Sequence, residues 1–244
     1  MAKLLISVRD HHEAVTAMSA GADIIDVKDP TRGSLGAADG ETARNVIAQV
    51  NDQLPVSMAC GELSQLDEAD SSDWNLPVRY AKIGMSEYRT RTSWRTDWSN
   101  WRRSLHVDTQ PIAVVYADAA PANSPSPWEI ISFAPHVGCV GVLIDTFRKH
   151  KSQSLLDCCS PVDVINMIQT AHENSLFVAV AGSLDRNSMP IVLDWGPEII
   201  AVRGAACSKN RVGRIDGRKV RGLAAVLANQ AELTLDQHVG EREP

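Results

Sequence analysis

The sequence lacks long apolar stretches, an excess of basic charge and the residue spacings of common metal sites. No apolar run in its 244 residues approaches the roughly 20 residues that span a membrane. The apolar stretch at the N-terminus is too short for a signal peptide and has no small-residue cleavage site. We therefore expect a cytoplasmic protein with no membrane partner.

The balance of charge and the cysteine count exclude further classes. The formal net charge is -6, whereas a nucleic-acid-binding surface would need a basic balance. The five cysteines are an odd number without metal-ligand spacing, and the histidines from His11 to His172 show no such spacing either. We expect no nucleic-acid partner, no metal and no cofactor, and a reducing compartment.

Eight apolar, strand-like runs alternate with segments of helical length. They cover residues 4–8, 22–30, 55–61, 79–84, 110–118, 139–145, 176–183 and 198–204. Alternating strands and helices imply a parallel sheet, and eight such units in about 250 residues are typical of a (β/α)8 TIM barrel. The alternative, a doubly wound open sheet, is weakened because no G-x-G-x-x-G follows the first run.

The sequence pattern also predicts the domain boundaries and the segments that interrupt the regular alternation. We expect one barrel domain over residues 1–232, with its last helix at about 218–231, and a polar C-terminal tail over 233–244. Residues 62–77 are acidic without a helical period, which predicts an irregular unit between strands 3 and 4. Tryptophans at three- and four-residue steps predict a packed helix over 92–106.

The run at 22–30 ends in charge, which a buried parallel strand does not need. Asp26 and Lys28 are two residues apart, so their side chains point to the same side of a strand. If that side is the inside of a barrel mouth, Lys28 is a reactive amine beside a carboxylate. The alternative is a simple ion pair at the edge of the core.

Other runs end in a similar way. In a TIM barrel the active site lies at the carboxyl ends of the strands, so residues at these positions are predicted to meet in one pocket. The predicted catalytic residues are Asp26, Lys28, Lys82, Asp118, Asp145 and Lys149. The predicted phosphate-binding residues are Gly182, Ser183, Arg203, Gly204 and Ala205.

Lys82 is the sharpest single signal, because an ammonium in a strand interior is disfavoured unless it is paired or deprotonated. Burial and a second nearby ammonium both lower a lysine pKa from its ordinary value of about 10.4. Two lysines at one barrel mouth therefore suit Schiff-base chemistry. The alternative for Lys82 is a salt bridge to a carboxylate of a neighbouring strand, such as Asp26.

Phosphate binding is predicted at the last two strands. Short glycine-containing turns follow both runs, at Gly182-Ser183 and at Gly204-Ala205, and their backbone N–H groups could hold a phosphate. Arg203 is predicted to supply the counter-charge. The early loop from Gly33 to Ala37 is another turn of small residues.

Several motifs resemble the (5-formylfuran-3-yl)methyl phosphate synthase family of methanofuran biosynthesis. They are Asp23–Pro30, Gly33–Ala37, Lys82–Gly84, Tyr116–Ala119, Asp145-Thr146, Ala181–Ser183 and Val202–Cys207. The resemblance implies a (β/α)8 barrel that condenses two molecules of glyceraldehyde 3-phosphate, with loss of phosphate and water, as a metal-independent lyase. It also implies a Schiff base on Lys28 with Asp26 as its partner. Lys82 and Lys149 are the further catalytic lysines that it implies, and Lys151 lies close to the second.

Two other functions stay open. One is a class I aldolase that acts on another phosphorylated aldehyde, and the other is a barrel that binds a phosphorylated metabolite without catalysis. We expect a small phosphorylated triose as the substrate, and a homo-oligomeric protein.

Overall fold

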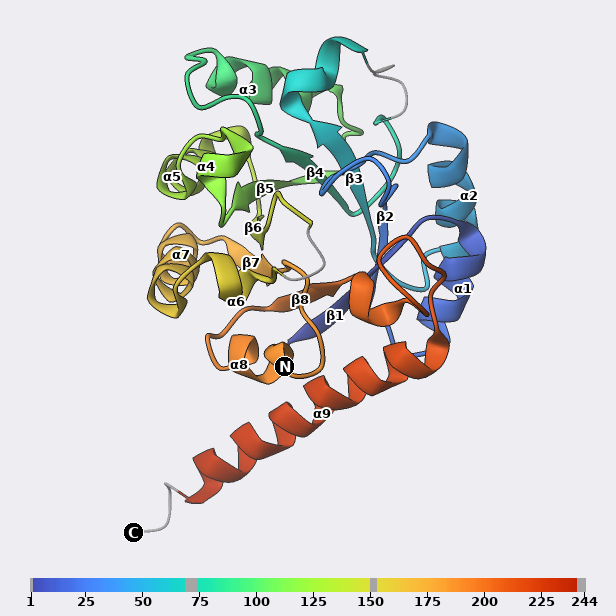
Figure 1. Cartoon of the computed structure of the whole chain (residues 1–244). Coiled ribbons are helices and arrows are strands. Elements are labelled where there is room, and N and C mark those ends of the chain that lie inside the picture. Colours follow the sequence, from blue (N-terminus) through green and yellow to red (C-terminus); the bar gives the residue numbers. More distant parts are fainter. Residues whose placement is uncertain (1, 69–73, 150–152, 241–244) are drawn as a thin grey trace.

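The computed structural model describes residues 2–68, 74–149 and 153–240, and it describes the backbone alone at 66–68 and 231–240. Eight parallel strands form a closed barrel in which each strand pairs with its neighbour in sequence and β8 pairs with β1 (Figure 1). The strands are β1 Lys3–Val8, β2 Ile24–Val27, β3 Val56–Glu62, β4 Tyr80–Gly84, β5 Gln110–Tyr116, β6 Gly141–Asp145, β7 Phe177–Val180 and β8 Ile199–Val202. The predicted TIM barrel is confirmed.

Helices surround the barrel on its outside (Figure 1). They are α1 His11–Met18, α2 Gly40–Val50, α3 Trp94–Ser104, α4 Ala119–Ala122, α5 Pro127–Val137, α6 Leu155–Cys158, α7 Pro161–Glu173, α8 Ser188–Leu193 and α9 Gly217–Gly240. Two 3-10 turns, η1 Leu63–Glu68 and η3 Gly204–Ala206, lie in the connections. No helix in the described part of the chain is long and apolar enough to cross a membrane.

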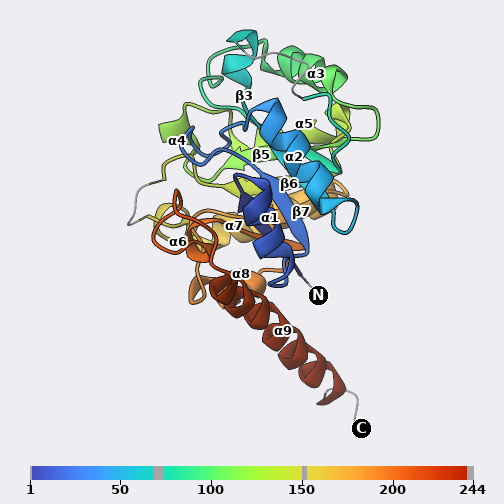
Figure 2. The same ribbon diagram turned by 90° about the vertical axis from the view of Figure 1, so that its right-hand side faces the viewer.

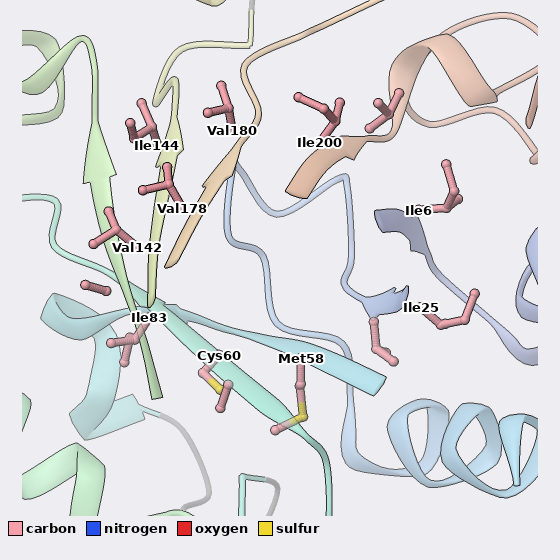
Figure 3. Packing of buried hydrophobic residues seen from close by; sticks show 14 of the residues in the cluster. Ile6, Ile25, Met58, Cys60, Ile83, Val142, Ile144, Val178, Val180 and Ile200 are labelled. Carbon is pink, nitrogen blue, oxygen red and sulfur yellow. The ribbon is translucent and has the colours of Figure 1, made fainter. Parts of the chain in front are cut away.

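The strands bury both faces, which explains their nearly continuous apolar sequences. One face packs against the helices, and Figure 3 shows residues of this outer core, among them Ile25, Ile83 and Ile200. The other face fills the barrel interior with a smaller cluster that includes Ile24 and Leu143. Because side chains alternate along a strand, Asp26 points to the inside of the barrel, as Ile24 does, and lines the cavity.

The predicted irregular unit between β3 and β4 and the predicted tryptophan-bearing helix are both confirmed in outline. The connection between β3 and β4 contains η1, no α-helix is described there, and residues 69–73 lie outside the described residues. Helix α3 forms over Trp94–Ser104 and buries Trp94, Trp98 and Trp101 in the outer core.

The C-terminal prediction needs a correction. Helix α9 continues to Gly240, so residues 233–240 extend the last helix instead of forming a polar tail. No glycine or proline interrupts the sequence between Leu223 and Val239, and most residues there are good helix formers. The last part of α9 projects beyond the barrel, as both views show (Figures 1 and 2).

Candidate active site

A cavity of about 760 Å³ opens at the carboxyl ends of the strands, where the sequence places the site. The charged residues that line it are Asp26, Lys28, Lys82, Asp145, Lys149, Asp185, Arg203, Lys209 and Arg211. Six of these are cations and three are carboxylates, although the whole chain has a net charge of -6. A cavity with this local excess of positive charge favours an anionic ligand.

Asp26 on β2 and Lys82 on β4 form a buried ion pair inside the barrel, with β3 between the two strands. Lys82 Nζ lies 2.5 Å from Asp26 Oδ1, and the side chains are only 6% and 2% exposed. Ser7 Oγ on β1 donates to the other carboxylate oxygen at 2.9 Å. The salt bridge considered for Lys82 is therefore present, and it fixes one amine on the wall of the cavity.

Lys28 stands directly after β2 and is half-buried. Its Nζ makes one long hydrogen bond, to the carbonyl oxygen of Ser34 at 3.4 Å. Burial lowers the pKa of Lys28 from 10.5 to about 8, although the carboxylates of Asp26 and Asp145 oppose the shift. At pH 7 about one Lys28 amine in ten is neutral, compared with roughly one in a few thousand for an ordinary lysine.

Asp145 and Lys149 form a second ion pair at the end of β6. Lys149 Nζ lies 2.5 Å from Asp145 Oδ1 and also donates to Thr146 Oγ1 at 3.1 Å. Burial alone would raise the pKa of Asp145, but Lys149 and Lys28 outweigh it and hold that pKa below its ordinary value. Asp145 is therefore a carboxylate, and Lys149 lies at the predicted place. Lys151, which follows it, lies outside the described residues.

The loop between β2 and α2 crosses the barrel mouth. Ser34 Oγ donates to Asp145 Oδ2 at 2.8 Å, although the two residues are 111 positions apart. Leu35 is buried in the barrel interior, and its carbonyl oxygen accepts from the N–H of Gly61 at 2.8 Å. A Cβ at Gly36 would lie 2.3 Å from the carbonyl oxygen of Asp29, so the loop needs glycine there. The loop therefore shapes the floor and wall of the cavity.

Asp118 does not line the cavity, contrary to its prediction as a catalytic residue. Its carboxylate accepts hydrogen bonds from the backbone N–H groups of Phe147 at 2.6 Å and Arg148 at 3.0 Å. The carboxylate thus holds the loop that carries Lys149, and its role in the structure is to position this loop.

The two predicted phosphate-binding turns lie together on the wall of the cavity. Gly182, Ser183, Gly204 and Ala205 all line it. Gly182 has φ +100 and Ser183 has φ 58, so both are left-handed and the turn is tight. Their backbone N–H groups, and those of Gly204 and Ala205, donate to no acceptor within the described residues.

Arg203, the predicted phosphate counter-charge, lines the cavity, but its hydrogen-bond donors all have partners within the protein. A guanidinium has five N–H donors, and here each has an acceptor. The acceptors are both carboxylate oxygens of Glu13 and the carbonyl oxygens of Ser7, Arg211 and Gly213. Both partners of the Glu13–Arg203 ion pair, which measures 2.5 Å, are buried. Arg203 therefore joins β8 to α1 and to the β8–α9 loop.

Four further residues that shape this site were not predicted from the sequence. They are Ser7, Glu13, Ser34 and Arg211. Ser7 could have been predicted from strand alternation, because it is the last inward-facing residue of the first strand. The others lie on a helix or in loops, where no strand periodicity indicates a direction. Among the described residues, no group of three or more His, Cys, Asp or Glu side chains is arranged to hold a metal ion.

Comparisons with known proteins find relatives that match most of this chain. The family model described as 4-HFC-P synthase matches residues 4–224. The (5-formylfuran-3-yl)methyl phosphate synthase of Methanopyrus kandleri is 36% identical over 238 residues, covering 93% of this chain and 99% of that protein. The same enzyme of Methanosarcina barkeri is 32% identical and covers 91% of this chain and 98% of its own length.

Solved structures at low sequence identity show the fold alone. The 3-hexulose-6-phosphate synthase of Salmonella typhimurium has a TM-score of 0.64 at 13% identity, covering 93% of this chain and 99% of that chain. Phosphoribosyl anthranilate isomerase of Thermus thermophilus has a TM-score of 0.62 at 14% identity, covering 93% and 98%.

Proposed function

Since the chain belongs to the 4-HFC-P synthase family, as its motifs suggest, we propose that it makes (5-formylfuran-3-yl)methyl phosphate from two molecules of glyceraldehyde 3-phosphate. The reaction would be a Schiff-base lyase reaction on Lys28, in methanofuran-type biosynthesis. Atom balance requires that one inorganic phosphate and two waters leave for each furan formed.

One observation carries the proposal: Lys28 is a half-buried amine of the cavity that has no ion pair with a carboxylate among the described residues. Lys82 is paired with Asp26 and Lys149 with Asp145. Lys28 lies near both pairs, and burial lowers its pKa to about 8. A neutral amine is the nucleophile that attacks an aldehyde, which supports Lys28 as the nucleophile of the proposed reaction.

The roles of the other groups follow from their contacts. The amine of Lys28 adds to the aldehyde carbon, and loss of water leaves an iminium ion. Lys149 and Lys82 are positioned to move protons during enamine formation, carbon–carbon bond formation and the eliminations, and each is held by its carboxylate. The free N–H groups of the turns after β7 and β8 would hold a substrate phosphate.

The direct test is to incubate the protein with glyceraldehyde 3-phosphate alone. We expect an ultraviolet-absorbing furan aldehyde, and borohydride added during turnover should leave a mass adduct on Lys28. An adduct without a furan product would favour a class I aldolase that acts on another phosphorylated aldehyde. Absence of both would favour a barrel that only binds a phosphorylated metabolite.

The rate of imine formation should depend on pH with a midpoint near 8. Below that pH the Lys28 amine is mostly protonated, so the apparent second-order rate of trapping should fall about tenfold per pH unit and should level off above it. The measurement is single-turnover trapping with cyanoborohydride from pH 6 to 10. A midpoint near 10.5, as for an ordinary exposed lysine, would contradict the burial of this amine.

A further inference from the structure

We propose that Arg211, in the loop between β8 and α9, is the cation that binds the phosphate group of the substrate and so selects phosphorylated aldehydes. The inference rests on the proposed function and assigns a residue to the anion site that the sequence analysis gave to Arg203.

The two arginines of the cavity differ in how many of their donors are used. All five N–H donors of Arg203 have protein acceptors, and its charge is neutralised by Glu13. Arg211 makes one side-chain hydrogen bond among the described residues, from Nη2 to the carbonyl oxygen of Gly33 at 2.8 Å, and no ion pair. Four of its donors therefore lack a protein partner within that part of the chain.

Arg211 extends from the phosphate-binding turn across the cavity. Its Cβ lies 3.9 Å from the point where a Cβ on Gly204 would stand, so the side chain begins beside this turn. Its guanidinium ends at the β2–α2 loop, on the carbonyl oxygen of Gly33. Arg211, Gly204 and Ala205 all line the cavity, so an anion bound at this turn would share the cavity with the positive charge of Arg211.

The backbone around Arg211 is fixed before any ligand binds. Three consecutive carbonyl oxygens, at residues 211, 212 and 213, accept hydrogen bonds from Arg203 Nε, Arg9 Nη1 and Arg203 Nη2 at 2.8 to 2.9 Å. The loop therefore does not have to be ordered when the ligand arrives, and less entropy is lost on binding.

The surroundings of Arg211 leave its charge incompletely compensated. Burial lowers the pKa of Arg211, and the charge of Arg203 adds to the shift, while the carboxylates of Asp145 and Asp29 oppose it. An arginine keeps its proton in spite of such a shift, so the uncompensated charge persists. A phosphate monoester dianion suits this site, because a guanidinium fork binds two phosphate oxygens at once.

The test compares a phosphorylated with an unphosphorylated aldehyde. Borohydride trapping on Lys28 is measured as a function of concentration with glyceraldehyde 3-phosphate and with glyceraldehyde, in the full-length protein and its variants. In Arg211→Ala the half-saturating concentration of glyceraldehyde 3-phosphate should rise about 10- to 100-fold, the loss expected for hydrogen bonds to a charged group. The value for glyceraldehyde should change less than about twofold.

Two further variants separate charge, geometry and loop structure. Arg211→Lys keeps the charge but loses the fork, so it should recover part of the loss. Arg214→Ala removes the same side chain from an exposed position in the same loop that does not line the cavity, and it should behave like the unaltered protein. An equal rise for both aldehydes in Arg211→Ala, or the same rise in Arg214→Ala, would overturn the assignment.

A binding measurement in which no reaction takes place distinguishes this inference from the proposed function. Calorimetric titration with inorganic phosphate should show weaker binding in Arg211→Ala than in the unaltered protein, by a similar factor. If Lys28 forms no adduct with either aldehyde but phosphate binding still depends on Arg211, the proposed function fails and the inference stands. If phosphate binds equally well to both proteins, the inference fails.

Discussion

Replacement of Lys28 by alanine is expected to abolish furan formation. The loss in kcat should be about 10⁴-fold or more, the range seen when the nucleophile of a covalent mechanism is removed, because the other two lysines at the base of the cavity are committed to carboxylates. The borohydride adduct should disappear at the same time. Steady-state kinetics and intact-protein mass spectrometry measure both effects.

The loss in Lys28→Ala should not come from unfolding. An amine whose pKa is lowered from 10.5 to about 8 in the folded protein opposes folding, and this penalty is fully present below about pH 8 and vanishes above about pH 10.5. Its removal should therefore leave the unfolding midpoint at pH 7 unchanged or higher. Lys3→Ala, which removes an exposed lysine at the opposite end of the barrel, is the matched control and should keep full activity. Near-normal activity in Lys28→Ala would refute the Schiff-base proposal.

Replacement of Glu13 by alanine is expected to cause a large loss of stability. It would leave the buried guanidinium of Arg203 without a counter-charge, and breaking a buried pair in this way typically costs about 3–5 kcal/mol. For a chain of this size the midpoint of thermal unfolding should fall by roughly 10 °C or more. Denaturant unfolding at pH 7 measures the free energy directly.

The control for this pair is the other cation on the same carboxylate. Arg9 Nε lies 3.0 Å from Glu13 Oε1, but its side chain is 32% exposed, so Arg9→Ala should cost about 1 kcal/mol or less. Similar losses in Glu13→Ala and Arg9→Ala would show that burial of the Glu13–Arg203 pair is not what stabilises the protein. The double variant Glu13→Ala/Arg203→Met removes both charges and should recover part of the stability.

The barrel and the positions of its strands could be predicted because eight apolar runs alternate with helical segments, and each run is confirmed as a strand. The two-residue alternation placed Asp26 and Lys28 on the inside, where they line the cavity. It failed for Asp118, which follows the end of β5, because its carboxylate accepts hydrogen bonds from loop N–H groups and does not line the cavity.

The partners of charged groups could not be predicted from one sequence. Arg203 was placed correctly at the end of β8, but its partner Glu13 lies 190 residues earlier, on a helix. Arg211 is in a loop, where neither a strand nor a helix period gives a direction. The expected homo-oligomer, the absence of a cofactor and the cytoplasmic location stay predictions.

The Glu13–Arg203 pair joins the first helix to the last strand, next to the pairing of β1 with β8 that completes the ring. During synthesis Lys28 emerges from the ribosome long before the strand that will bury its surroundings. Until the ring closes, its amine should titrate like any lysine in an unfolded chain. The reactivity of this one amine toward an aldehyde could therefore report, in a refolding experiment, the moment at which the two ends of the barrel meet.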